Sequence, residues 1–528
     1  MFKNNLYSRK RTTILTSLIF ICLASTPTFA QLTSQKIDLL MEDALAKFKV
    51  AGASIAIVKD GKIIHQKGYG VTSIETKKAV NENTNFQIAS NSKAFTTAAL
   101  SILEDEGKLK WTDKVKDHIP EFKMYNDYVT ENFNIQDLLT HRSGLGLGVG
   151  DLMFFPDGSN FTIKDVLNGF QYFKPVSAFR TQFDYDNLLY VVAGELIART
   201  SGMSYEAFVQ KRIIEPLQMN NSFAASSLIK DKSNLAVPHS SESGTIKAIE
   251  SFGVQMNSAA GGIISNVADM AKWMTVSMNK GQYGPDLKTT LFSEKNHNEM
   301  WRIHTVEEAD QNPRYNSHFR GYGLGWELAD IKGNLEVSHT GGLPGMLSIV
   351  KMYPDQNLGI VILTNTQNGG AGLFMAVSNT ISDSYLGLDD FGWTDKMVTW
   401  MSQDEASGDD VTKKAWQKVA SSKNVKIKNE DFIGVYADKW FGEIEVFEKN
   451  KQLWFKSYRS PKLSGPMAFY NANTFAVKWE YQAMNCDAFA MFSLDETGKA
   501  QAIKMKGISP NIDFSFDFQD LDLKRVQK

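Results

Sequence analysis

Two predicted strand pairs lie at either end of a long, mostly helical segment, and this arrangement most constrains what the chain can fold into. The first pair is Ala53 to Val58 and Ile63 to Tyr69, and the second is Met346 to Tyr353 and Leu358 to Thr364. In each pair a short turn joins two apolar runs, which is typical of neighbouring antiparallel strands. The pattern predicts an α+β fold in which an antiparallel sheet flanked by helices joins early and late segments, beside a largely helical second lobe.

A different pattern begins after about Leu386. The polar stretch Ser402 to Asp410 offers little that could be buried, so we expect residues 386–427 to be a linker with short helices. From about Lys428 the apolar residues alternate, and Glu443 to Tyr458 has the pattern of a hairpin. We therefore expect two domains, residues 31–385 and a small antiparallel β-barrel over residues 428–528. Further short strands are predicted at Thr474 to Trp479, Phe489 to Leu494, Ala502 to Lys506 and Phe514 to Phe518.

The first thirty residues have the pattern of a cleaved secretory signal. A positively charged start precedes the apolar run Ile14 to Ala24, which is too short to span a bilayer comfortably. Small residues then follow at Thr28 and Ala30, where a signal peptidase would recognise them. An uncleaved anchor is the alternative. We expect an exported protein, periplasmic or secreted, with no membrane span once the signal has been removed.

The charge and cysteine content argue against several other classes of protein. The 528 residues include 57 Lys and Arg and 59 Asp and Glu, so no large basic excess would attract nucleic acid. Without the signal segment the chain keeps one cysteine, Cys486, so its stability must come from core burial and not from an internal disulfide. No Cys/His cluster has zinc spacing. We expect no nucleic-acid partner, no metal and no cofactor.

Ser90 and Lys93 are the first candidate catalytic pair. A lysine one helical turn after a serine can place its amine beside the hydroxyl and take its proton. The same spacing starts at Ser227, Ser277 and Ser348, but only Ser90 opens a long helix with an apolar face. Free backbone N–H groups and the positive end of the helix dipole would lie beside such a nucleophile. On its own, this motif favours an N-capping serine with a solvated lysine.

Two more motifs follow along the chain. Tyr185 and Asn187 precede an apolar run; a tyrosine near a cation can act as a general base, and the asparagine can bind a substrate amide. The sequence His339-Thr340-Gly341-Gly342 places residues without side chains after polar ones. This order suits a strand edge that a substrate backbone approaches closely. A helix edge and a glycine-rich turn are the ordinary structural alternatives.

In this order, the three motifs resemble those of the serine β-lactamase and penicillin-binding protein superfamily. The likeness is greatest to its class C-like branch of S12 peptidases, D-aminopeptidases and esterases. It covers about residues 34–385, and the C-terminal segment resembles the lipocalin-like domain of the archaeal S12-peptidase group. Supporting stretches are Leu138 to Leu145, Ser258 to Asp269 and Tyr322 to Trp326.

The resemblance implies a role for each motif in the chemistry. Ser90 would attack a carbonyl carbon and become acylated. Lys93 and Tyr185 would share the proton transfers, and either could be the base. The backbone N–H groups of Ser90 and Gly342 would form the oxyanion hole.

The remaining positions of the motifs would bind the substrate. The resemblance implies that Asn187 orients it and that Thr340 and Gly341 contact it. His339, which we count with Ser90, Lys93 and Tyr185 as a candidate catalytic residue, stands where β-lactamases and many penicillin-binding proteins have a lysine. A histidine is mostly uncharged near neutral pH unless its pKa is raised, which weakens the β-lactamase interpretation. His141 we expect to form hydrogen bonds within the fold.

The leading hypothesis is an exported serine hydrolase that cleaves a small peptide, amide or ester. A penicillin-binding D,D-peptidase or weak β-lactamase is the alternative within enzymes, and a catalytically inactive binding or scaffold protein is the alternative outside them. A homo-oligomer is possible. The C-terminal barrel would cover the cleft, restrict substrate size or assemble subunits, or it would be a passive stabilising module.

Overall fold

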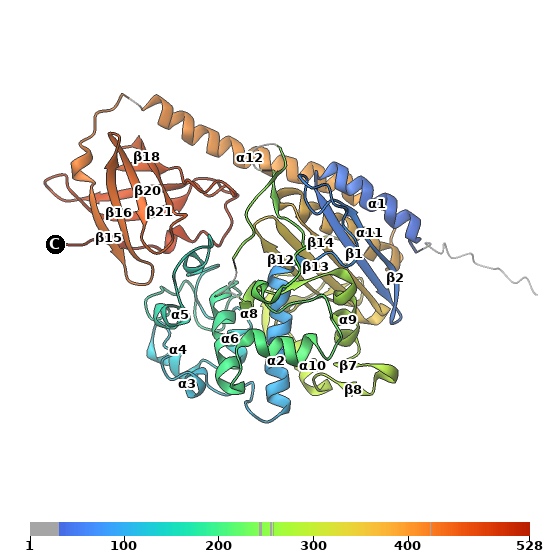
Figure 1. The fold of residues 1–528 in the computed structure, drawn as a ribbon. Helices are drawn as coiled ribbons and strands as arrows, with labels where there is room; N and C mark the ends of the chain where they lie inside the picture. Colours follow the sequence, from blue (N-terminus) through green and yellow to red (C-terminus); the bar gives the residue numbers. More distant parts are fainter. Residues whose placement is uncertain (1–30, 242–244, 254–255, 257, 423, 528) are drawn as a thin grey trace, which may run out of the picture.

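An eight-stranded antiparallel sheet forms the centre of the first domain of the computed structural model, which describes residues 31–527 except 242–244, 254–255, 257 and 423 (Figure 1). The strand order is β2-β1-β14-β13-β12-β11-β10-β9, and the pairing of β1 with β14 joins the two predicted strand pairs. The predicted union of early and late segments is confirmed. The strands are β1 Gly52–Lys59, β2 Lys62–Gly70, β9 Thr305–Glu307, β10 Arg320–Tyr322, β11 Glu327–Ile331, β12 Asn334–Leu343, β13 Met346–Tyr353 and β14 Leu358–Thr364.

Helices cover both faces of this sheet. Helices α1 (Ser34–Lys47) and α11 (Gln367–Tyr385) pack on one face, called here the outer face, and α9 (Val267–Met278) packs on the other. The central strands β1 and β14 are buried along almost their whole length, because their apolar side chains point alternately into the two cores. Ile349 of β13 belongs to the outer core, and its neighbour Val350 belongs to the inner one.

The helical lobe is centred on α2 (Ser92–Asp105), which is buried from Ser92 to Leu103. Helices α6 (Asn187–Ser201) and α8 (Ser258–Gly261) pack against α2, and the turn before α2 contacts β12. The N-terminal end of α2 therefore lies where the lobe meets the sheet. The remaining helices are α3 Val115–His118, α4 Asp127–Asn132, α5 Ile163–Gly169, α7 Tyr205–Val209 and α10 Glu294–Met300, and short strand pairs are β3 Phe86–Gln87 with β6 Ile264–Ser265, β4 His239–Ser240 with β5 Lys247–Ala248, and β7 Gln282–Tyr283 with β8 Thr289–Thr290.

The C-terminal segment forms a closed eight-stranded antiparallel barrel, as predicted. The predicted strand at Phe514 to Phe518 is wrong: this segment is part of the connection between β21 and β22. Its alternating phenylalanines have the pattern of a strand, but Phe516 packs edge-on against Phe155 of the first domain, with ring centroids 5.0 Å apart. The strands are β15 Gly434–Asp438, β16 Gly442–Lys449, β17 Gln452–Ser457, β18 Ser464–Asn471, β19 Thr474–Val477, β20 Ala488–Leu494, β21 Ala500–Gly507 and β22 Leu523–Arg525.

One long helix, α12 (Trp393–Ser421), connects the two domains, where we predicted a polar break between short helices. The prediction fails because a helix that is solvated over most of its length can have the polar composition of a linker. Trp393 is buried in the outer core of the first domain, and Ala415 and Val419 pack on the barrel. Gly408 lies against Asn511 of the barrel, where an added Cβ would be 2.6 Å from the amide nitrogen.

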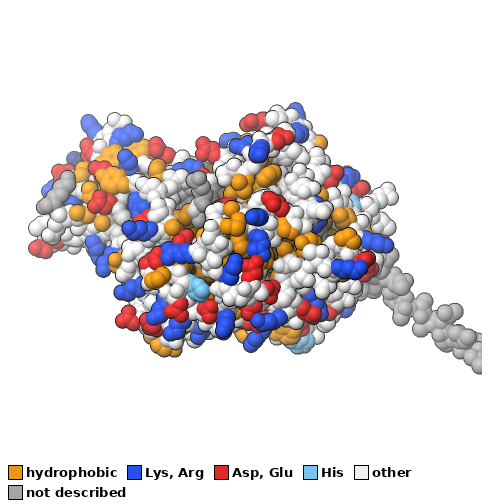
Figure 2. All heavy atoms as spheres, turned by 60° about the horizontal axis from the view of Figure 1, so that its bottom comes forward, with side chains coloured by type: hydrophobic (Ala, Val, Ile, Leu, Met, Phe, Trp, Pro, Cys, Tyr) orange, Lys and Arg blue, Asp and Glu red, His pale blue; other side chains and the backbone are white. Residues whose placement is uncertain are grey.

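The surface carries both signs of charge. On the face shown in Figure 2, Lys and Arg side chains are interspersed with Asp and Glu side chains over both domains. A mixed surface of this kind offers no field of one sign on this face to steer a strongly charged polymer. The predicted signal at residues 1–30 lies outside the described residues, and among the helices that are described none is both long and apolar enough to cross a membrane.

Candidate active site

Ser90 lies on a tight turn between the sheet and α2. The turn is a single 3-10 turn, Ala89–Asn91, and Ala89 adopts a left-handed conformation with φ of 48°. Such strain in a residue other than glycine persists only where the surroundings enforce it. Ser348 of β13 enforces it in part, because its Oγ donates to the Ile88 carbonyl at 2.7 Å and accepts from Asn91 Nδ2 at 2.8 Å.

The turn presents Ser90 to a cavity of about 350 Å³ instead of using it as a helix cap. The N-cap of α2 is Asn91, and within the described chain no side chain caps this helix. Ser90 itself is half-buried. The three other serines with the same spacing are placed differently: Ser227 is exposed, Ser277 bonds to its own helix, and Ser348 holds the catalytic turn.

Lys93 is completely buried beside Ser90. Its Nζ lies 3.1 Å from Ser90 Oγ, 2.7 Å from Asn187 Oδ1 and 3.1 Å from the Ala260 carbonyl oxygen. Burial lowers the pKa of Lys93 to about 7, against the opposing influence of two buried acids, Asp151 and Asp186. Near neutral pH a substantial fraction of this amine is therefore unprotonated.

These three partners suit a neutral amine. An unprotonated lysine has two N–H donors and one lone pair. Asn187 Oδ1 and the Ala260 carbonyl can only accept, so they take the two N–H groups. The lone pair then faces the Ser90 hydroxyl, which is the arrangement needed to remove its proton.

Tyr185 lies beside both Lys93 and Ser90. Lys93 Nζ is 4.6 Å from the centre of its ring, and His141 stacks on the same ring with centroids 4.2 Å apart. Burial raises the pKa of Tyr185 well above its ordinary value, although a hydrogen bond with Ser90 opposes this. His141 Nδ1 accepts from the Asp186 backbone at 3.0 Å, so its position serves the fold around Tyr185.

Asn187 contacts the lysine, and its predicted role in orienting the substrate stays a prediction. Asp186 caps α6 and places Asn187 at the first helical position, where it lines the cavity. Its Oδ1 accepts from Lys93 Nζ at 2.7 Å and its Nδ2 donates to Asp151 Oδ2 at 2.8 Å. Both ends of the amide are thus engaged within the protein, which fixes the position of the lysine amine.

His339 is buried and neutral. The Thr340 carbonyl oxygen, 2.5 Å from Nδ1, can only accept, so Nδ1 carries the proton. Nε2 is then the acceptor for the Tyr322 hydroxyl at 2.8 Å. Burial, and secondarily the charge of Lys93, lower the pKa of His339 to about 3. This side chain therefore provides no cation to the cavity at neutral pH.

The glycines of the third motif serve two purposes. A Cβ on Gly341 would lie 2.3 Å from the Ile88 carbonyl oxygen, so glycine is needed there for the catalytic turn itself and not only for a substrate. Gly342 is exposed and lines the cavity with Thr340. The predicted oxyanion donors, the N–H groups of Ser90 and Gly342, thus belong to segments that border the same cavity.

The barrel supplies part of the site, which the sequence did not predict. Ser515 Oγ donates to Asp151 Oδ2 at 2.9 Å, the same oxygen that Asn187 holds, and Asp151 is completely buried. Phe514 packs edge-on against Tyr185 with centroids 5.8 Å apart. Asp513 lines the cavity beside Phe514 and Ser515. No sequence signal links Ser515 to Asp151, because the two are 364 residues apart.

Among the described residues that line the cavity, Glu307, Glu327 and Asp513 are acidic and Arg320 is the one cation. Arg320 donates to Glu327 Oε2 at 2.8 Å, and its Nε lies 3.6 Å from Glu307 Oε2. Burial raises the pKa of both glutamates. Within the described part of the chain, no group of three or more His, Cys, Asp and Glu could hold a metal ion. The arrangement is that of a lysine-assisted serine nucleophile.

Solved structures resemble the fold over nearly the whole chain. The octameric penicillin-binding protein homologue from Pyrococcus abyssi matches with a TM-score of 0.59 and 21% identity, over 90% of this chain and 98% of that one. SurE matches with a TM-score of 0.54 and 15% identity, over 93% of this chain and 99% of that one. At these identities the likeness concerns the fold alone.

Sequence comparisons place the first domain in a family. Protein flp of Staphylococcus aureus (strain MW2) is 29% identical over 339 residues, 63% of each chain, so this chain spans just under two thirds of that relative. Unguisins hydrolase ungD of Aspergillus violaceofuscus is 27% identical over 385 residues, 69% of this chain and 67% of that protein. Residues 422–525 match a domain of unknown function, DUF3471. Residues 37–377 match the model of the Beta-lactamase family, and the chain belongs to that family.

Proposed function

We propose that this chain is an exported serine hydrolase that cleaves a peptide, amide or ester through an acyl-enzyme on Ser90. The observation that carries the proposal is the buried Lys93 amine, 3.1 Å from Ser90 Oγ and with a pKa lowered to about 7. A general base works best when its pKa lies near the operating pH.

Lys93 is the stronger candidate for the base in acylation. Deprotonated Lys93 is accessible near neutral pH, whereas burial keeps the Tyr185 hydroxyl protonated. Tyr185 would then act through its hydroxyl, as a donor that passes a proton between Ser90, Lys93 and the leaving group.

The reaction would proceed in two balanced halves. Lys93 takes the Ser90 proton while Oγ attacks the substrate carbonyl carbon, and the N–H groups of Ser90 and Gly342 stabilise the oxyanion. Collapse breaks the scissile bond, and the leaving amine or alkoxide takes the proton from Lys93. Water then attacks the ester carbonyl, releases the acid and restores the Ser90 hydroxyl.

The surroundings favour peptides and esters over β-lactams. A β-lactam carries a carboxylate, and neutral His339 gives it no cation. Arg320, the cation that lines the cavity, is already paired with Glu327. A backbone N–H group can still donate to the carbonyl oxygen of an uncharged amide or ester, and a backbone carbonyl can accept from the N–H of an amide. Because the Pyrococcus abyssi homologue is described as octameric, we also propose that this chain forms homo-oligomers, which light scattering would test.

A covalent label tests the proposal directly. A fluorophosphonate should modify wild-type protein at Ser90, identified by peptide mass spectrometry, and Ser90→Ala should not be labelled. Turnover of an acyl ester, a D-aminoacyl anilide and a chromogenic cephalosporin would then rank the substrate classes. Folded wild-type protein that is neither labelled nor active would support the inactive binding protein instead.

A further inference from the structure

Strand β12 has an unpaired edge beside Ser90. Strand β11 pairs with β12 only as far as Ser338, whereas β13 pairs with it as far as Leu343. Among the described strands, none occupies the β11 side of residues 340–343. The turn before β11 leaves the sheet toward α2, where a Cβ on Gly325 would lie 3.1 Å from the Lys93 carbonyl oxygen. An extended substrate can therefore add a strand to this edge, in line with β11.

The register of such a strand follows from the sheet. A substrate strand in line with β11 would run antiparallel to β12. Positions along β12 from Gly342 back to Thr340 therefore lie opposite substrate residues that run from the scissile bond toward the C-terminal, leaving-group side. With the scissile carbonyl at the Gly342 N–H, the second residue after the scissile bond lies opposite Thr340. Directly opposite residues share one face of a sheet. Thr340 pairs with Ile349, whose side chain is in the outer core, so that substrate side chain points to the outer face.

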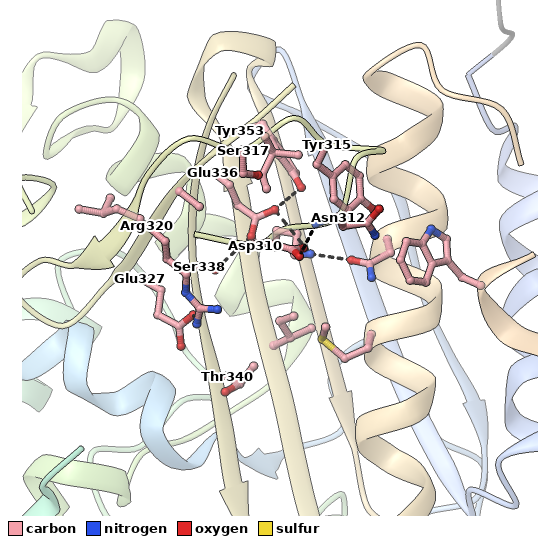
Figure 3. Close-up of a pocket in the computed structure, with 18 of the residues that line it drawn as sticks. Asp310, Asn312, Tyr315, Ser317, Arg320, Glu327, Glu336, Ser338, Thr340 and Tyr353 are labelled. Carbon is pink, nitrogen blue, oxygen red and sulfur yellow. Dashed lines mark hydrogen bonds and ion pairs between the residues drawn. The ribbon is translucent and has the colours of Figure 1, made fainter. Parts of the chain in front are cut away.

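A second cavity, of about 540 Å³, opens on this face (Figure 3). Arg320, Glu327 and Thr340 line both this cavity and the catalytic one, so the two adjoin. The outer cavity lies against β11, β12 and β13 on one side and against residues of α11 and α12 on the other. A side chain opposite Thr340 would therefore enter it directly.

The buried charges of this outer cavity are already paired. Lys351 Nζ donates to Asn379 Oδ1 at 2.8 Å and lies 3.6 Å from Glu336 Oε2. Glu336 also accepts from the Tyr353 hydroxyl, and Ser338 Oγ lies 3.5 Å from its other oxygen. An incoming ion would lose its hydration and find Lys351 and Glu336 engaged with each other; Asp310, which also lines this cavity, accepts from the Asn312 backbone N–H at 2.9 Å.

The rest of the lining is largely apolar. Ile349, Met375, Met397 and Trp400 contribute carbon surface, and Trp400 is 48% exposed. Ser317 also lines this cavity, and its buried Oγ has no hydrogen-bond partner within the described residues. Resting on the proposed function, we propose that the outer cavity binds a large uncharged side chain, aromatic or branched aliphatic, on the second residue after the scissile bond of a peptide substrate.

A peptide library tests this specificity. Full-length protein would be incubated with an equimolar peptide mixture, and mass spectrometry would locate the cleaved bonds. We expect Phe, Tyr, Leu or Ile at the second position after the cut. For matched synthetic peptides, kcat/KM should be at least about tenfold higher than with Gly, Lys or Glu there, equivalent to about 1.4 kcal/mol.

Variants on α11 locate the preference. Met375→Trp would fill the outer cavity, and the ratio of kcat/KM for the Phe peptide to that for the Gly peptide should fall toward one. Thr380→Trp adds the same side chain to the same helix at a position that lines a different cavity, so it should keep the wild-type ratio. Fluorophosphonate labelling of Ser90 checks that each variant retains a formed catalytic site.

The outcomes separate this inference from the proposed function. Failure to label wild-type Ser90 would overturn both. Labelled enzyme that cleaves no peptide, shows no preference at the second position, or keeps its preference in Met375→Trp would overturn the outer-cavity assignment alone.

Discussion

Ser515→Ala tests whether the barrel positions the catalytic lysine. Ser515 Oγ is one of two donors to Asp151 Oδ2, at 2.9 Å; the other is Asn187 Nδ2, at 2.8 Å. Asn187 in turn holds Lys93 Nζ at 2.7 Å. The carboxyl is completely buried, and within the described residues its Oδ1 has no partner. Leaving such a group short of a hydrogen bond costs about 1–3 kcal/mol.

Two kinetic changes should follow from this loss. If about 1.4 kcal/mol of this free-energy cost raises the activation barrier, because the lysine is misplaced in the transition state, kcat/KM falls about tenfold. Burial raises the pKa of Asp151 well above its ordinary value, the hydrogen bonds from Asn187 and Ser515 oppose that rise, and the negative charge of Asp151 raises the pKa of Lys93. Without Ser515 the pKa of Asp151 rises further, so a smaller fraction of this carboxyl is negatively charged. The pKa of Lys93 then falls below about 7, and the rising limb of the pH profile moves to lower pH.

The assay is the pH dependence of kcat/KM for an uncharged acyl ester between about pH 5 and 9. This range lies above the ordinary pKa of carboxyl groups and below that of tyrosines, so neither contributes a limb to the profile. Ser509→Ala is the matched control, because Ser509 is a buried serine near the same loop whose Oγ accepts from the Asn511 backbone. Ser509→Ala should change neither kcat/KM nor the pH at which the rising limb of the profile lies. A folded Ser515→Ala protein with wild-type kcat/KM and an unmoved limb would refute the positioning role.

Three other perturbations test separate parts of the structure. Lys93→Arg keeps the charge but cannot release its proton, so acylation in a stopped-flow burst should fall by several orders of magnitude, and a rapid burst would exclude Lys93 as the base. Because the pKa of His339 is about 3, wild-type kcat/KM should show no descending histidine limb between about pH 5 and 8. His339→Lys should raise kcat/KM for an anionic cephalosporin about tenfold, but not for a neutral ester. Arg459→Ala should lower the free energy of unfolding by about 1 kcal/mol, because Arg459 bonds Asp165 across the two domains. That bond lowers the pKa of Asp165 to about 2, so its stabilisation is present above about pH 4 and lost toward pH 2; a urea-midpoint difference unchanged over that range would contradict this.

The fold was predictable where local pattern and burial agree. The two strands of the late pair, Met346–Tyr353 and Leu358–Thr364, have the predicted bounds, because apolar runs bounded by turns indicate strands directly. Residues 393–421 were not predictable, because a solvated bridging helix has the composition of a linker. The segment Phe514 to Phe518 has the alternation of a strand, yet its phenylalanines pack on another domain. Local pattern does not say which surface an apolar residue will cover.

The candidate site was predictable only in its motifs. Ser90, Lys93 and Tyr185 come together as the resemblance implied. The partners of Asn187 were not predictable, since an amide can bind a substrate or a side chain equally well. Asp151 was missed because it lies in a glycine-rich loop, and nothing in its local sequence links it to Lys93 or Asn187. A buried acid beside a catalytic lysine becomes visible only when the loop is folded.

The catalytic centre is a joint product of both domains. A barrel that only covered the cleft could be removed without loss of Ser90 reactivity, but this one supports the loop that carries Asp151. Asp517 accepts from the backbone N–H groups of Gly150 and Leu152 at 2.7 and 2.9 Å. Removing the barrel would replace these partners, and the Ser515 hydroxyl that donates to Asp151, with water. The Asp151 loop would relax, and the amide that holds the lysine would lose its anchor. On the proposed function, we therefore expect that acylation of Ser90 requires the barrel, and that folded protein truncated before residue 428 reacts more slowly with a fluorophosphonate than the full chain does.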